Sequence, residues 1–147
     1  MATTQTQIAA SPNEVFAALA NPRNYGDWVV GSDTIRDADP TWPKVGSRFH
    51  HRIGFALLKI HDYTEVLEVD APHRLVMHAR AGPLGTAKIT MLLTERHHGT
   101  HVTMIEVAGD RLSALVLNRL TDPLVHLRNA EALRRLKRIV ETGRSNA

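Results

Sequence analysis

The sequence predicts an α+β fold in which a curved antiparallel sheet of about seven strands wraps around one long C-terminal helix. Two observations predict it. Strand-like segments alternate with turn signals at hairpin spacing between Val45 and Ala108. The segment Pro123 to Thr142 then carries apolar residues at helical spacing, with its basic residues largely on the other side of the helical wheel. A helix of this length spans about 30 Å, enough to cover a small curved sheet.

The first part of the chain predicts one strand and two short helices. Thr4 to Ala10 has the pattern of a strand. The signals of a helix start follow it, with Ser11 at the N-cap, Pro12 at the first helical position and Glu14 as the reciprocal capping residue. Asn21 and Pro22 end this helix near Ala20, and Arg23 to Trp28 is expected to form one more turn.

The middle of the chain predicts an antiparallel meander, because its strand patterns are separated by short turn signals. After an extended stretch from Val29 to Ile35, the predicted strands are Val45 to Ile53, Ile60 to Val69, His73 to Arg80, Thr86 to Arg96 and Thr100 to Ala108. The long helix then begins at Pro123 and ends near Gly143.

Size and composition indicate a single domain spanning residues 1–147. The chain is 43% hydrophobic and 22% charged, which fits one globular core. It has no cysteine, so disulfides, thiolate zinc sites and thiol nucleophiles are excluded, and we expect a cytoplasmic protein. There is no apolar run of transmembrane length, and we therefore expect no integral membrane association.

The distribution of charge and histidine excludes two further classes of partner. The formal net charge is only +3, and the basic residues of the last helix read as a solvated face with no aromatic residues beside them, so we expect no nucleic-acid partner. Nine histidines are present, but pairs such as His50 and His51 point to opposite faces of a strand. We expect no metal site and no cofactor, and the sequence does not indicate an oligomeric state.

Alternation along each strand predicts which side chains face the long helix. Between Ile60 and Val69 the more apolar set, with Tyr63 and Leu67, brings Glu65 and His61 inward. The predicted ligand-binding residues are Trp28, Phe49, His51, His61, Tyr63, Glu65, Leu67, Met77, Ile89, Met91, Leu93, Met104, Glu106, Val125, Asn129 and Leu133.

The polar members of this set need an explanation, because a carboxylate in an apolar interior is costly without a partner. Glu65 and Glu106 could pair with His51 and His61 as a buried structural network, anchor a ligand, or take part in chemistry. The apolar neighbours of Glu106 leave the opposite phase of its strand open. Asn129 lies on the apolar side of the predicted helix, where leucine would suit a purely structural role.

The order of elements resembles the helix-grip architecture of the START-like (SRPBCC) superfamily. The amino-acid sequences of several segments are similar to those of its polyketide cyclase/dehydrase-type branch. These segments are Ala10 to Phe16, Asn21 to Trp28, Val45 to Ser47, Thr64 to Pro72, Gly99 to Thr103 and Arg128 to Leu136. The resemblance covers essentially the whole chain. It implies an apolar ligand cavity between sheet and helix, in a superfamily of carriers, receptors and a few enzymes; fold alone does not decide among these.

The resemblance also implies roles for individual residues. In the plant hormone receptors of the superfamily, the glutamate of a strand Thr-Glu motif, a glutamate in the penultimate element and an asparagine on the long helix contact the ligand directly or through water. Thr64-Glu65, Glu106 and Asn129 look like their counterparts. The receptors' ligand-pairing lysine is replaced by Gly26, which argues against an acidic ligand.

Two apolar loops are predicted to form a lid at the mouth of this cavity. Phe55 and Leu57 lie in one apolar hairpin connection, and Pro83 and Leu84 lie in a second turn at the same end of the sheet. The alternative is that these loops pack against the segment Arg111 to Leu120.

Three hypotheses for the function follow. The first is a carrier, sensor or sequestering protein for a polyketide, isoprenoid, sterol-like compound or lipid. The second is a polyketide cyclase, aromatase or dehydratase, in which Glu65 or His51 abstracts a proton and Tyr63 or Asn129 stabilises the enolate. The third is an interaction module that uses the lid and the basic helix.

Overall fold

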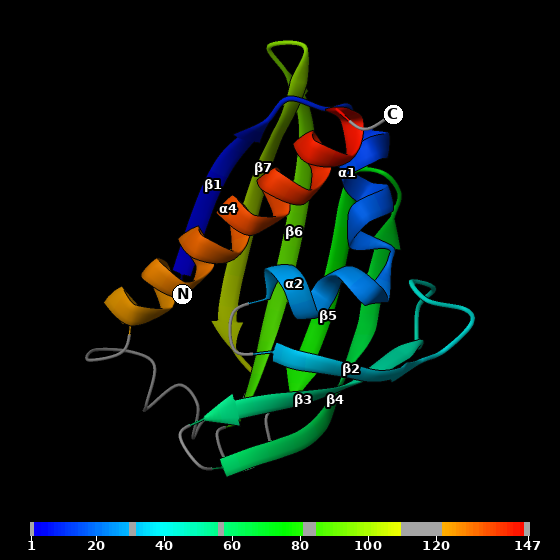
Figure 1. The fold of residues 1–147 in the computed structure, drawn as a ribbon, viewed down its shortest axis with the longest axis vertical. Coiled ribbons are helices and arrows are strands. Elements are labelled where there is room, and N and C mark those ends of the chain that lie inside the picture. Colours follow the sequence, from blue (N-terminus) through cyan, green and yellow to red (C-terminus); the bar gives the residue numbers. More distant parts are fainter. Residues whose placement is uncertain (1, 30–31, 56–57, 81–84, 110–121, 146–147) are drawn as a thin grey trace.

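The computed structural model describes residues 2–29, 32–55, 58–80, 85–109 and 122–145 (Figure 1). Its elements are β1 (Ala2–Ile8), α1 (Pro12–Leu19), a 3-10 helix η1 (Pro22–Asn24), α2 (Tyr25–Trp28), β2 (Ser32–Ala38), β3 (Arg48–Phe55), β4 (Leu58–Asp70), β5 (Arg74–Arg80), β6 (Thr86–Arg96), β7 (Gly99–Ala108) and α4 (Asp122–Ser145).

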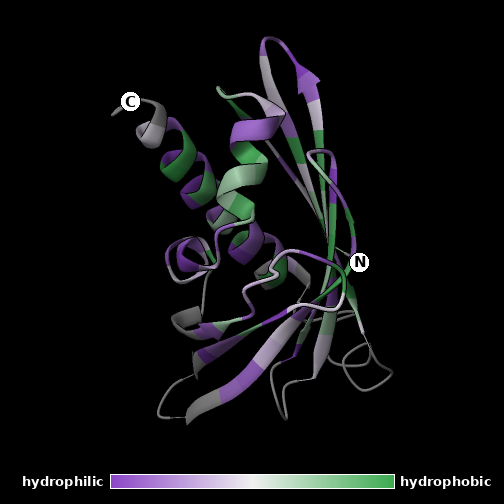
Figure 2. Cartoon of the chain, turned by 90° about the vertical axis from the view of Figure 1, so that its right-hand side faces the viewer, coloured by the Kyte–Doolittle hydropathy of each residue, from purple (hydrophilic) through white to green (hydrophobic). Residues whose placement is uncertain are grey.

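The strands form one antiparallel sheet in the order β1-β7-β6-β5-β4-β3-β2. The helices lie on one side of it, and α4 crosses the sheet diagonally (Figures 1 and 2). We call the face toward α4 the inner face. The upper end is where α4 ends and the lower end is where it begins, as drawn in Figure 1. The predicted helix-grip fold is confirmed.

Local signals fix α1 as the sequence predicts. The hydroxyl of Ser11 accepts a hydrogen bond from the backbone N–H of Glu14 at 3.2 Å, and Pro12 opens the helix. One face of the helix buries Val15 and Leu19. Capping satisfies a backbone donor, and burial of the apolar face stabilises the short helix, which would be marginal in isolation.

The β6–β7 hairpin turns at His97 and His98, which both have positive φ (54° and 60°) as a two-residue hairpin loop requires. Gly99 follows because a Cβ at this position would collide with the backbone oxygen of Ile8. Within the described residues, no three acidic or histidine side chains are grouped so that they could hold a metal ion.

The hydrophobic core gathers at the upper end, where the second half of α4 meets α1 and the strands. Leu136 is 0% exposed. The cluster around it includes Ile8, Val15, Leu19, Leu75, Met91, Leu93, Val102, Ala132, Leu133 and Val140. Burying a leucine-sized side chain contributes about 1.5–3 kcal/mol, so this cluster supplies much of the stability of the fold.

A β-bulge in β4 changes which of its residues face α4. Val66 pairs with Met77 and Glu68 with Val76, which leaves Leu67 as the extra residue. Alternation therefore inverts at this point. Simple alternation counted back from Leu67 and Val69 assigns the wrong face to the side chains of β4 that precede the bulge.

The helices of the described ranges offer no candidate for a membrane crossing, since none combines the necessary length with enough apolar residues.

Candidate functional site

Exposure of the inner-face side chains increases from the upper to the lower end of the sheet. Along β7, Val102 is 0% exposed, Met104 5% and Glu106 8%, and Ala108 is half-buried. The same trend runs along β5 and β6, which end at the half-buried Ala79 and Ala87. The inner face is therefore closed by packing at the upper end and accessible at the lower end.

Small residues occupy the sheet at this lower end. Ala79 pairs with Ala87, and Ala87 pairs with Ala108, so three alanines form one row across β5, β6 and β7. Thr64 of β4 and Phe49 of β3 continue the row. A row of methyl groups fills little volume between a sheet and a helix, whereas a packed core needs larger side chains there.

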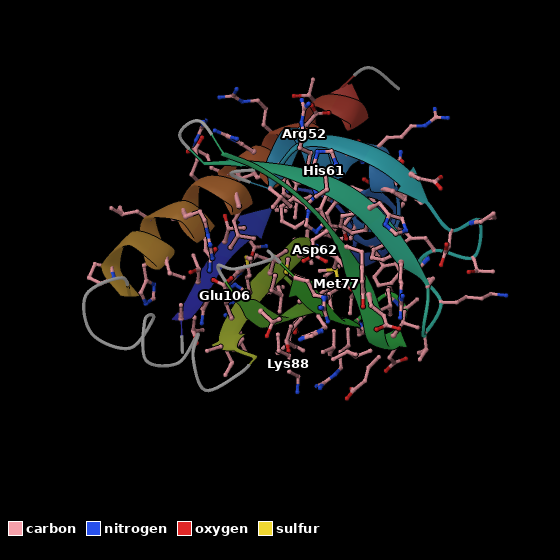
Figure 3. All side chains as sticks on the ribbon, turned by 90° about the horizontal axis from the view of Figure 1, so that it is seen from below. Arg52, His61, Asp62, Met77, Lys88 and Glu106 are labelled. Atoms are coloured by element: carbon pink, nitrogen blue, oxygen red, sulfur yellow. The ribbon has the colours of Figure 1, made fainter. Side chains whose placement is uncertain are left out.

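Beside the alanine row, Glu106 forms a hydrogen-bonded network with α4. Its Oε2 accepts from Nδ2 of Asn129 at 3.2 Å and forms an ion pair with Nη2 of Arg128. Nε of Arg128 donates to Oδ1 of Asn129 at 3.2 Å, which closes the ring of contacts. Asn129 is 1% exposed, while the Arg128 side chain is 40% exposed. Figure 3 shows Glu106 beside α4 in the view from below.

A second polar pair lies on β3 and β4. Nε2 of His51 and Oγ1 of Thr64 are 3.1 Å apart, and both residues are buried. Asp62, two residues before Thr64 on β4, is the register partner of His51. Its carboxylate forms an ion pair with Arg80 at 3.5 Å. Asp62 and Met77 lie within the ring of strands in Figure 3, whereas Lys88 lies outside it.

An aromatic cluster joins α2 to β3. The ring of Tyr25 lies 4.5 Å from that of Phe49 and 5.1 Å from that of Trp28, and Trp42 lies 4.7 Å from Phe49. The Tyr25 hydroxyl donates to the carbonyl of Leu19 at 3.0 Å, and burial raises its pKa. Nε1 of Trp28 and Nε1 of Trp42 are buried without a hydrogen-bond acceptor among the described residues.

The predicted orientation of His61, Tyr63, Glu65 and Leu67 is wrong, because the bulge at Leu67 turns the preceding residues to the outer face. Figure 3 shows His61 and Asp62 on opposite sides of the β4 ribbon. Tyr63 lies under the guanidinium of Arg48 at 4.3 Å, and Glu65 pairs with the same arginine at 3.5 Å. Leu67 is 40% exposed.

The other predicted positions fall where the sequence indicates. All of them are buried except Ile89, which is half-buried at the lower end: Trp28, Phe49, His51, Met77, Ile89, Met91, Leu93, Met104, Glu106, Val125, Asn129 and Leu133.

Sequence reasoning missed the inward roles of Asp62, Thr64 and Arg128. The first two follow from the bulge. Arg128 was expected on the solvated face of the last helix, but its long side chain bends back to Glu106. A signal was available, since a buried glutamate predicted on a strand requires a nearby cation.

The proposed lid lies largely outside the described residues. Leu57, Pro83, Leu84 and the segment 111–120 are not among them, and of Phe55 only the backbone at the end of β3 is described.

On the solvent side of α4, Glu131 binds two arginines. Its carboxylate accepts two hydrogen bonds from Arg134, both at 2.7 Å, and one from Nε of Arg135 at 3.0 Å. These hydrogen bonds lower the pKa of Glu131 to about 2, and those from Arg134 have the largest effect. Part of the positive charge of this helix is thus compensated within the helix itself.

Comparison with known proteins gives a family and a fold. Residues 1–141 match the family described as "Polyketide cyclase / dehydrase and lipid transport". Among curated proteins, none matches this chain. Three solved structures illustrate the shared fold. Protein CV1439 from Chromobacterium violaceum is 17% identical with a TM-score of 0.75, covering 95% of each chain.

Protein NE0264 from Nitrosomonas europaea is 16% identical with a TM-score of 0.73, over 96% of this chain and 94% of its own. Ms6760 from Mycobacterium smegmatis is 21% identical with a TM-score of 0.72, over 96% and 90%. At these identities the structures establish the fold alone. The family match extends over nearly the whole chain and agrees with the sheet wrapped around α4, so this chain belongs to the polyketide cyclase/dehydrase and lipid-transport family of the START-like (SRPBCC) superfamily.

Proposed function

We propose that this protein binds a largely apolar small molecule between the lower inner face of the sheet and the first turns of α4. In this role it is a carrier, sensor or sequestering protein for a polyketide, isoprenoid, sterol-like compound or lipid. The main support is the rise in exposure toward the alanine row, because apolar inner-face residues that keep contact with solvent gain free energy when a ligand covers them.

The polar groups near this row suit recognition of a ligand that carries a few oxygen atoms. Glu106 and Asn129 lie on the α4 side, and His51 and Thr64 lie on the β3–β4 side. Methionine side chains above the row, such as Met77 and Met104, adapt to irregular apolar shapes. A mostly apolar surface with few convergent polar groups is typical of small-molecule sites.

The cyclase hypothesis with Glu65 as the base and Tyr63 as the enolate stabiliser has less support. Its candidate base Glu65 and its candidate enolate stabiliser Tyr63 lie on the outer face, paired with Arg48. Of the residues that this hypothesis uses, His51 and Asn129 lie on the inner side, where His51 is hydrogen-bonded to Thr64 and Asn129 donates to Glu106. We therefore place the binding function first.

The test fills the proposed site. Ala87→Phe adds a ring to the centre of the alanine row and should weaken binding of the neutral dye Nile red, and of any compound that copurifies, by about tenfold or more. Fluorescence titration measures the dye, and native mass spectrometry detects the copurified compound.

Ala130→Phe is the matched control, because Ala130 is exposed on α4 and the same ring there should leave binding unchanged. The proposal fails if the wild-type protein binds neither the dye nor a panel of lipids and polyketides. It also fails if both variants bind as tightly as the wild type.

A further inference from the structure

The network of Glu106, Arg128 and Asn129 contains one carboxylate and one guanidinium group at the lower end of the inner face. Oε2 of Glu106 and both side-chain heteroatoms of Asn129 are engaged inside the network. Among the described residues, Oε1 of Glu106 and Nη1 of Arg128 make no hydrogen bond. One acceptor atom and one donor group therefore remain beside each other at the boundary between β7 and α4.

Charge in this network is balanced within it, because Glu106 is compensated by Arg128. The other acid on this part of the inner face, Asp62, forms an ion pair with Arg80. A ligand carboxylate would add a second negative charge beside the buried Glu106, and among the described residues Arg128 is the one cation that pairs with Glu106. Removal of a charge from water is costly unless the site supplies a partner.

We infer that the polar end of the ligand is uncharged and carries a hydroxyl or enol, which donates to Oε1 of Glu106 and accepts from Nη1 of Arg128. The ligand class is thus an apolar alcohol, phenol or enol, and the corresponding carboxylic acids are excluded. Arg128 is then a specificity-determining residue, since it sets the charge that the site can accept. This inference rests on the proposed function.

A matched pair of probes tests the selection. Dodecanol and dodecanoate share an apolar chain and differ in the charge of the polar end at neutral pH. Displacement of Nile red, at concentrations below micelle formation, gives the dissociation constant of each. The wild-type protein should bind dodecanol more tightly by about tenfold.

Two charge-changing variants should move the preference in opposite directions. Glu106→Gln removes the acid, leaves Arg128 uncompensated and should shift the preference toward dodecanoate by about tenfold or more. Arg128→Gln leaves Glu106 uncompensated and should weaken dodecanoate binding further. Arg138→Gln removes an exposed charge from the same helix and should leave the ratio unchanged.

The double variant Glu106→Gln with Arg128→Gln restores neutrality and should return the ratio toward the wild-type value, which separates a charge effect from a loss of folding. Equal or tighter binding of dodecanoate by the wild type overturns the inference, as does a shift of both single variants in the same direction. If neither probe nor the dye binds, the proposed function fails and the inference falls with it, whereas binding without preference overturns the inference alone.

Discussion

The two ends of the inner face differ in what fills the space between sheet and helix. At the upper end, Leu75, Met91 and Leu136 are fully buried and belong to one core cluster. At the lower end, the alanine row takes the place of large side chains, and Glu106 and Asn129 replace apolar contacts by hydrogen bonds. The same sheet and the same helix therefore build a structural core at one end and an accessible, partly polar surface at the other.

Along each strand, we therefore expect the upper residues to serve stability and the lower residues to serve ligand binding. Residues two positions apart on β6, Met91 and Ile89, share a face but belong to different ends. Substitutions at the upper end should act on the free energy of unfolding. Substitutions at the lower end should act mainly on ligand affinity, because those side chains gain less from folding.

The largest contrast is expected from truncation on β6. Met91→Ala removes a side chain that is 0% exposed and should lower the free energy of unfolding by about 2–5 kcal/mol. Ile89→Ala should cost only roughly 1 kcal/mol, since this residue is half-buried. Urea unfolding followed by circular dichroism measures both. Equal losses would show that the two ends are packed alike.

Enlarging an alanine should give the opposite contrast. Ala132→Phe, in the core at 3% exposure, should destabilise by about 1–3 kcal/mol or prevent folding, because a packed core has no room for a ring. Ala87→Phe should cost less than about 1 kcal/mol. Thermal unfolding of the two variants compares them. A severe loss of stability in Ala87→Phe would mean that the lower end is already filled.

The smallest effect concerns the buried hydroxyl of Tyr25. Burial raises its pKa, so the folded state keeps the proton at a pH where the unfolded chain, with a tyrosine pKa near 10, has released it. This contribution is complete below about pH 10 and is lost above it at up to about 1.4 kcal/mol per pH unit.

Tyr25→Phe should therefore cost about 1 kcal/mol at neutral pH, through the lost hydrogen bond to Leu19, and should unfold less steeply with rising pH. Urea unfolding at several values between about pH 9 and 11 measures the difference. Parallel curves for the wild type and the variant would contradict the assignment to Tyr25.

Much of the fold could be predicted from local patterns. Ser11 and Pro12 start α1 as their capping chemistry requires, and β6 has the predicted bounds, Thr86 to Arg96. These features depend on residues close in sequence, so short-range rules suffice. The inner position of Asn129 was also predictable from the helical periodicity of α4, whereas the pattern of β7 left two orientations open for Glu106.

Local patterns did not predict which side chains of β4 face the helix. Its apolar residues Leu67 and Val69 suggest one continuous alternation, yet the bulge at Leu67 sends Tyr63 and Glu65 to the outer face. A bulge depends on how β4 pairs with β5, which is a non-local property that no single strand pattern carries. The interpretation of Glu65 as an interior base was wrong for this reason.

The sequence by itself determined the order of the elements, the amphipathic character of α4 and the inward position of Asn129 on that helix. Which side of β7 carries Glu106 inward was decided by the tertiary structure. Only the tertiary structure decided that Arg128, which the helical wheel assigns to solvent, reaches Glu106. Periodicity gives the direction in which a side chain leaves its backbone, but a long flexible cation ends where the nearest buried anion lies, and that position exists only once β7 and α4 have packed together.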